Sequence, residues 1–115
     1  MIRSVRILAI LSLLVLAGTV LAQSRFNEIK ARGELRCGVN STLAGFGYVD
    51  AAGEYQGFDV DFCRAIAAAV FGDPNAVVFR PVTAGERPTA LQSGEVDVLI
   101  RNTTRTSIRE TDWGA

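Results

Sequence analysis

The sequence predicts an α/β domain in which helices flank both faces of a parallel β-sheet. Apolar runs of strand length alternate with helical patterns along residues 35–115, which is typical of parallel strands joined by crossover helices. Glycines and prolines separate these runs, as expected for turns. Two of the expected strands also end in polar segments, at the sheet edge where such domains bind ligands. We therefore predict one small domain with a binding site at that edge.

The first 22 residues are predicted to be a signal peptide. Two arginines precede an almost wholly apolar stretch over residues 7–21, and Ala22 completes a small-residue cleavage site before Gln23. A retained membrane anchor is the alternative, although the apolar stretch is short for a spanning helix. Export with cleavage would place the mature chain in the periplasm.

Charge and composition argue against several classes of function. The chain contains 12 basic and 12 acidic residues, so neither a nucleic-acid partner nor a polybasic membrane patch is expected. Removal of residues 1–22 would take away Arg3 and Arg6 and leave 10 basic against 12 acidic residues. Histidine is absent, and the two cysteines lack metal-ligand spacing, so no zinc site, cofactor or histidine-based catalysis is expected. The protein is expected to be a monomer.

The two cysteines, Cys37 and Cys63, are compatible with a disulfide. An exported chain meets an oxidising compartment in which thiols can pair. Pairing requires Cα atoms less than about 7 Å apart, a separation that the sequence does not provide. Separate burial of two small apolar side chains is the alternative.

The first half of the chain begins with a predicted lead-in helix over residues 23–34, where charged and apolar residues follow helical spacing up to Gly33. Residues 35–39 form the first expected strand. A glycine-rich loop over residues 43–48 follows, and residues 54–58 are expected to return as the second arm of a short hairpin.

The strongest helical pattern covers residues 60–71, with Asp59 as the expected N-cap. Its predicted apolar face consists of Phe62, Cys63, Ile66, Ala67, Val70 and Phe71. Residues 76–82 form the next expected strand. Proline is tolerated only in the first turn of a helix, so Pro88 places the start of the following helix near Arg87.

The last expected strand, residues 96–100, runs into the segment 101–106, which has no apolar side chain. Ser107 and Glu110 have capping-box spacing, so a helix carrying Arg109 in its first turn is expected here. Helix N-termini and arginine forks both bind carboxylates well. A polar surface loop with solvated arginines is the alternative, but residues 40–42 should end at the same sheet edge, which favours a crevice.

Four segments carry a resemblance to a known family: GELRCGV (33–39), GFDVDFCRA (57–65), ALQSGEVDVL (90–99) and RNTT (101–104). Together with the predicted signal peptide, they resemble the family-3 periplasmic solute-binding proteins of amino-acid ABC transporters, and most of all their general L-amino-acid-binding branch. The resemblance implies a type II periplasmic-binding-protein lobe. Because such proteins are several-fold longer, residues 35–115 are expected to be the first part of the N-terminal lobe, truncated and without a second lobe.

The resemblance further implies binding of a free L-amino acid and its delivery to an ABC transporter permease in the inner membrane. Arg109 matches the position that grips the ligand carboxylate. The other implied ligand-binding residues comprise two that complete the polar contacts, one polar residue near the ligand and two in the apolar wall: Asn102, Thr104, Asn40, Leu43 and Phe46.

Two alternative functions accompany this hypothesis. An exported enzyme of the same fold, such as a dehydratase, would need an acid–base pair in the crevice, and the expected crevice residues provide none. A gene fragment without an independent role would fit a chain that ends just as its last expected helix begins. Our expectation is a binding protein and not an enzyme.

Overall fold

The computed structural model describes residues 25–104 and 106–108, and the chain divides into two units at Gly33. In the first unit, residues 25–32 form a helix. This helix lies within the predicted range of 23–34 and ends before Gly33, as expected, because Gly33 has a positive φ of 79°, a conformation that ends helices. The predicted signal peptide lies outside the described residues. No described helix has the length and apolar character that a membrane span requires.

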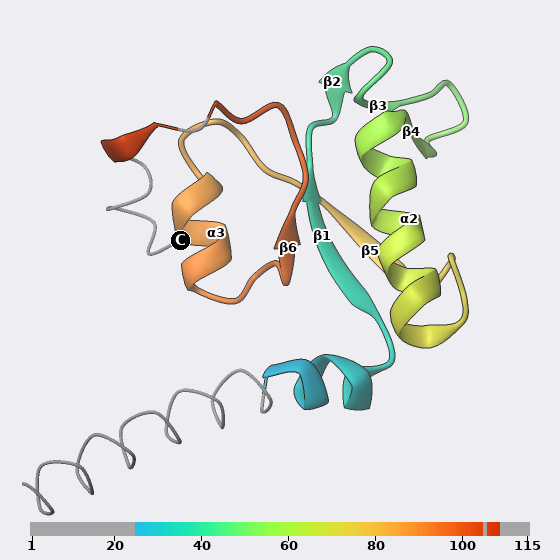
Figure 1. The fold of residues 1–115 in the computed structure, drawn as a ribbon. Coiled ribbons are helices and arrows are strands. Elements are labelled where there is room, and N and C mark those ends of the chain that lie inside the picture. The colour runs from blue at the N-terminus through green and yellow to red at the C-terminus, as the bar shows by residue number, and fades with distance from the viewer. Residues whose placement is uncertain (1–24, 105, 109–115) are drawn as a thin grey trace, which may run out of the picture. The chain divides into compact units, whose positions relative to one another are not determined.

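The second unit is built on a three-stranded parallel sheet, as predicted (Figure 1). β1 (Leu35–Val39) lies between β5 (Val77–Pro81) and β6 (Val98–Leu99). β6 is shorter than the expected strand over residues 96–100, because it pairs with β1 at only two positions.

Just before β6, the chain is held by contacts other than strand pairing. The Val96 N–H donates to the carbonyl of Ala90. Arg36 and Asp97 bind each other twice, because the Arg36 N–H donates to Asp97 Oδ2 and the Asp97 N–H donates to the Arg36 carbonyl, both at 2.8 Å. The approach to β6 is therefore a loop anchored to β1 and to the helix that contains Ala90.

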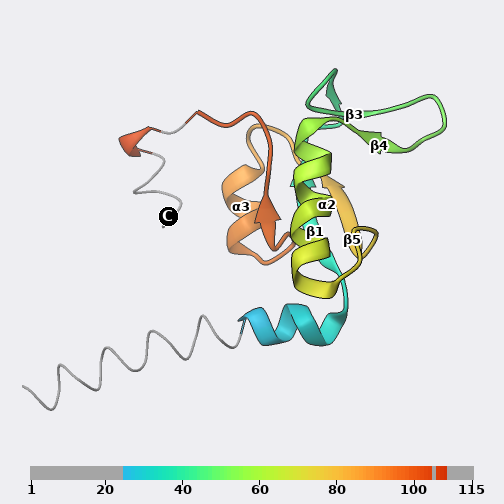
Figure 2. The same cartoon turned by 45° about the vertical axis from the view of Figure 1, so that its right-hand side comes forward.

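Helices lie on both faces of the sheet, which also agrees with the prediction (Figures 1 and 2). α2 (Phe58–Phe71) covers one face, where its residues Val60 and Cys63 pack on Cys37 and Val39 of β1. α3 (Arg87–Gln92), with Pro88 in its first turn as expected, contributes to a second cluster of Val82, Ala90 and Val96. Gly38, between the two core residues of β1, faces this second cluster. Because successive residues of β1 point to opposite faces of the sheet, this strand contributes to both clusters.

The start and the buried face of α2 both differ from the prediction. Asp59 is not the N-cap, since Gly57 occupies that position without a side-chain hydrogen bond. The buried residues of the helix are Asp59, Val60, Cys63 and Ala67, whereas Phe62 is 53% exposed. Cys63 and Ala67 of the predicted face are buried and Ile66, Val70 and Phe71 are half-buried, so Phe62 is the member of that face that turns outward.

Between β1 and α2 the chain forms a small antiparallel sheet of β2 (Thr42–Leu43), β3 (Gly47–Val49) and β4 (Tyr55–Gln56). The β3–β4 hairpin was expected, but the pairing of β2 with β3 falls in a segment predicted as a loop. The glycine turn at residue 45, with φ of 83°, makes this pairing possible because it reverses the chain tightly.

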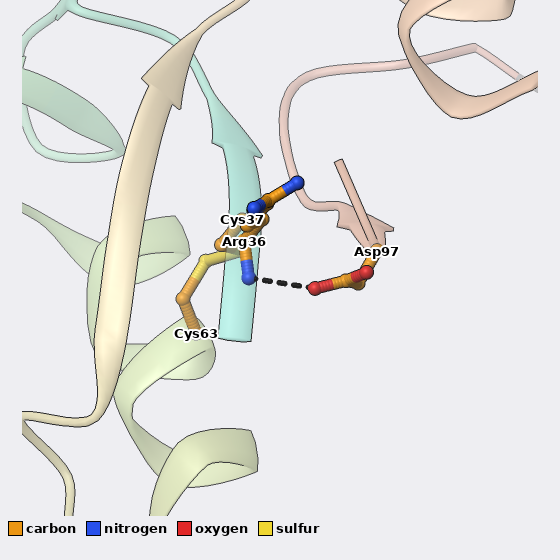
Figure 3. The surroundings of a disulfide bond; sticks show 4 residues. All are labelled: Arg36, Cys37, Cys63 and Asp97. Carbon is orange, nitrogen blue, oxygen red and sulfur yellow. Dashed lines mark hydrogen bonds between the residues drawn. A yellow bond between two sulfur atoms is a disulfide. The ribbon is translucent and has the colours of Figure 1, made fainter. Parts of the chain in front are cut away.

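A disulfide between Cys37 and Cys63 joins β1 to α2 (Figure 3). The two Cα atoms are 6.2 Å apart, and both residues are completely buried. Of the two alternatives that the sequence leaves open, the structure contains the disulfide. This bond fixes the helix to the central strand within the first core cluster.

Candidate ligand-binding site

The carboxyl ends of the three parallel strands meet at one edge of the sheet, where a cavity of about 430 Å³ opens. β1 leads into Asn40, β5 leads into Val82, and the chain after β6 leads into Arg101. The residues that line this cavity come from all three strand ends: Asn40, Ser41, Thr42, Pro81, Val82, Thr83 and Arg101. We call this cavity the crevice.

A hydrogen-bonded network orients the amides at the crevice. Asn40 Oδ1 accepts from the Thr42 N–H at 3.0 Å and from the Thr42 hydroxyl at 3.2 Å. Its Nδ2 donates to Asn102 Oδ1, also at 3.2 Å. The segments that follow β1 and β6 are thereby joined, and the Asn40 amide has a defined orientation.

Arg101 connects the remaining strand end to this network. Its Nη1 donates to the Val82 carbonyl, and its Nη2 donates to Asn102 Oδ1 at 3.2 Å. The guanidinium is therefore held between the end of β5 and the polar segment after β6. A side chain restrained in this way loses less conformational entropy when a ligand binds.

The loop after β5 is held by Glu86. Its carboxylate accepts from the Thr83 N–H at 2.9 Å and from the Thr83 hydroxyl at 2.6 Å. These two hydrogen bonds lower the pKa of Glu86 below its ordinary value, because they favour the charged form. Thr83 is thereby fixed where it lines the crevice.

A second cavity, of about 440 Å³, also borders Arg101 but has a different chemical character. It is lined by Phe58, Asp59, Phe62, Leu91, Leu99, Ile100, Arg101 and Thr103. All of these side chains are aromatic or aliphatic except those of Asp59, Arg101 and Thr103. Asp59 is only 7% exposed, and its Oδ2 has no hydrogen-bond partner. Burial raises the pKa of Asp59, an effect that the positive charge of Arg101 partly offsets. The second cavity therefore contains an acidic group that would repel an anion.

The structure brings together some of the residues that the sequence singled out, and not others. Asn40 lines the crevice and contacts Asn102. Thr104 is exposed and is not among the lining residues. Leu43 lies in β2 and Phe46, which is 50% exposed, lies in the adjoining turn, and neither lines the crevice. Arg109 lies outside the described residues.

Arg101, Ser41 and Thr83 line the crevice but were not among the predicted ligand-binding residues. The signal for Arg101 was present in the sequence, because it directly follows the last strand, just as Asn40 follows the first. Thr83 had no comparable signal. It follows Val82, which the sequence assigns to the strand, and its position depends on the turn held by Glu86.

Gly47→Ala is expected to destabilise the chain by about 1–3 kcal/mol, the usual cost of overpacking. A Cβ at residue 47 would lie 2.5 Å from the carbonyl oxygen of Asn40, so the Asn40 backbone would have to move. Thermal denaturation, together with the NMR shift of the Asn40 side-chain amide, would measure both effects. Gly85→Ala is the matched control because its Cβ would meet nothing within 4 Å. Equal stability of the two variants would contradict the prediction.

A parallel sheet with a polar crevice beyond its strand ends defines a ligand-binding α/β domain. The sequence model of the bacterial extracellular solute-binding proteins, family 3, matches residues 35–113. This match covers more than half of the chain, and the chain therefore belongs to that family.

Individual relatives agree with this assignment. The general L-amino acid-binding periplasmic protein of Rhizobium johnstonii is 50% identical over 103 residues, which are 90% of this chain and 30% of the relative. The glutamate/glutamine/aspartate/asparagine-binding protein of Rhodobacter capsulatus is 56% identical over 89 residues, covering 77% of this chain and 26% of the relative. This chain thus spans less than a third of either protein.

Among solved structures, an ABC transporter periplasmic binding protein from Brucella ovis with glutathione bound has the same fold. Its TM-score is 0.74 at 60% sequence identity, over 77% of this chain and 28% of that protein. This chain therefore matches only a part of that larger structure.

Proposed function

We propose that this chain is the substrate-binding component of an amino-acid ABC transporter. It binds the carboxylate of a free L-amino acid in the periplasm and delivers the amino acid to a permease in the inner membrane. The observation that carries the proposal is the crevice, where a guanidinium and oriented amides gather at the strand ends of a chain from this family. Residues 1–22 act as the signal peptide, and the protein works as a monomer.

In this proposal the predicted site residues keep distinct roles. Arg109 binds the α-carboxylate of the ligand, because a guanidinium offers a carboxylate two parallel hydrogen bonds. Asn102 and Thr104 contribute further polar contacts to the carboxylate and the ammonium group. Asn40 lies near the bound ligand, and its orientation by Thr42 and Asn102 supports that role.

The apolar side chains Leu43 and Phe46 pack against the side chain of the amino acid. Leu43 lies in β2 and Phe46 in the turn between β2 and β3. Such a wall contributes hydrophobic contact, whereas the polar network determines how the ligand is oriented.

Binding rather than catalysis is proposed because of the chemistry of the crevice. The described residues that line it include no aspartate, glutamate or histidine, and general acid–base catalysis needs a positioned group of that kind. In the described part of the chain, no cluster of three acidic, cysteine or histidine side chains could hold a metal ion. The crevice is suited to recognising a charged small molecule.

Arg109→Ala is expected to weaken amino-acid binding at least about tenfold, because hydrogen bonds to charged groups contribute about 1.5–3 kcal/mol. The test uses the 115-residue chain, expressed with its own N-terminus in a bacterial host, and follows amide NMR shifts during titration with L-amino acids. NMR detects binding even at millimolar affinity, which suits a chain that spans less than a third of the length of these relatives.

Arg36→Ala is the matched control. It removes the same charge from β1 at the edge of the sheet opposite the crevice. Equal binding by the Arg109 variant and the unaltered chain would remove the role assigned to Arg109. If no L-amino acid shifts any resonance of the folded chain, the proposed function is wrong.

A further inference from the structure

Arg101 is the only charged side chain among the described residues that line the crevice. The other six lining residues offer hydroxyl groups, one amide and apolar surface. Arg101 therefore dominates the electrostatic potential of the crevice lining. A neutral set of hydrogen-bonding groups around one cation favours an anionic group of a ligand.

The guanidinium has hydrogen-bonding capacity to spare. It has five N–H donors, and the two described hydrogen bonds use one donor on Nη1 and one on Nη2. Nε is buried and has no partner. No carboxylate of the described residues forms an ion pair with Arg101, in contrast to Arg64, which pairs with Asp61 at 3.1 Å. The charge of Arg101 acts on Asp59, but a tethered guanidinium with N–H donors to spare is still preorganised to bind a further carboxylate.

The two cavities beside Arg101 differ in a way that decides where an anion binds. The second cavity contains Asp59, whose buried carboxylate lacks a partner on Oδ2 and would repel a second acidic group. The crevice has no acidic residue in its described lining. An acidic ligand group is therefore expected in the crevice, whose described lining contains no carboxylate that would compete with it for Arg101.

We propose that Arg101 is a specificity-determining residue that makes the crevice prefer amino acids with a second, side-chain carboxylate. This inference rests on the proposed function, in which Arg109 binds the α-carboxylate. Arg101 then pairs with the second carboxylate. Asn102 accepts hydrogen bonds from both Arg101 and Asn40, and it thereby holds these two side chains in a fixed relative position. An amino acid with a neutral side chain offers Arg101 no second carboxylate and binds more weakly.

L-Glutamate and L-glutamine test this proposal because they have nearly the same shape and differ in the side-chain charge. The full chain, titrated at neutral pH with NMR detection, is expected to bind glutamate about tenfold more tightly than glutamine, in line with the strength of charged hydrogen bonds. Arg101→Gln is expected to abolish this preference by weakening glutamate binding while leaving glutamine binding within about twofold.

Two further variants make the test specific. Arg36→Gln changes the net charge equally at the far edge of the sheet and should keep the preference for glutamate. Arg101→Lys retains the charge without the planar fork, so it should keep part of the preference. This variant and the comparison of the two ligands on the unaltered chain serve as tests even if Arg101→Gln fails to fold.

The outcomes separate the two proposals. Equal affinity of the unaltered chain for glutamate and glutamine would overturn the role of Arg101 and leave the proposed function standing. The same would follow if Arg101→Gln weakened both ligands equally, since Arg101 would then contribute to general binding only. Absence of binding by either ligand, or by any other L-amino acid, would overturn both proposals.

Discussion

Removal of the Cys37–Cys63 disulfide is expected to lower the free energy of unfolding by about 3.5 kcal/mol. The bond closes a loop with a sequence separation of 26 residues, and the estimate follows from the chain entropy that this closure removes from the unfolded state. The bond also joins the central strand β1 to α2. For a domain of this size, the loss corresponds to a melting temperature that is lower by roughly 15–25 °C.

Thermal denaturation with and without a thiol reductant measures this effect. The double variant Cys37→Ala/Cys63→Ala is the matched control. Alanine suits these completely buried positions because serine would bury two hydroxyl groups. Reductant should lower the melting temperature of the unaltered chain and leave that of the double variant unchanged. A melting temperature of the unaltered chain that does not respond to full reduction would contradict the prediction.

Gly57→Ala is expected to destabilise the chain by about 2–6 kcal/mol, the sum of backbone strain and steric overlap. Gly57 is the N-cap of α2 and has a φ of 115°, a region that side chains other than hydrogen rarely allow. A Cβ there would lie 2.4 Å from the carbonyl oxygen of Phe46 and 2.6 Å from its carbonyl carbon. That carbonyl accepts a hydrogen bond from the Asp59 N–H at 2.9 Å. If the carbonyl moved, this hydrogen bond between the segment before β3 and the start of α2 would break.

Gly53→Ala separates the two contributions. Gly53 also has a positive φ, of 84°, but a Cβ there would meet nothing within 4 Å. Its substitution should therefore cost only the backbone term, about 1–2 kcal/mol. Chemical denaturation of both variants gives the difference between them. If Gly57→Ala were no more destabilising than Gly53→Ala, the close approach of Gly57 to Phe46 would be wrong.

Local sequence signals predicted the framework of the domain well. The bounds of β1 and the start of α3 agree with the structure, because a bounded apolar run and a proline in the first turn of a helix have few alternatives. The parallel order of the strands followed from the alternation of strands and helices. Polar residues directly after β1 and after the last strand likewise predicted where the crevice lies.

The start of α2 could not be predicted from local signals. Asp59 is a good N-cap by residue type, but its side chain is buried and its N–H binds the Phe46 carbonyl. Residues 46 and 59 meet only because the hairpin folds back on the helix. The outward position of Phe62 has a similar origin, because the disulfide and small residues determine which face of α2 meets the sheet.

The sequence by itself determined the class of the domain, the order of its elements, the family resemblance and the edge of the sheet that carries polar residues. These depend on periodicity and on residue types that follow one another along the chain. The tertiary structure alone decided that Cys37 and Cys63 are joined, that Asn40 meets Asn102, and that Arg101 lines two cavities, of which only one has an acidic residue in its described lining. Each of these features requires two segments distant in sequence to be a few ångströms apart, a separation set by the packing of the whole domain.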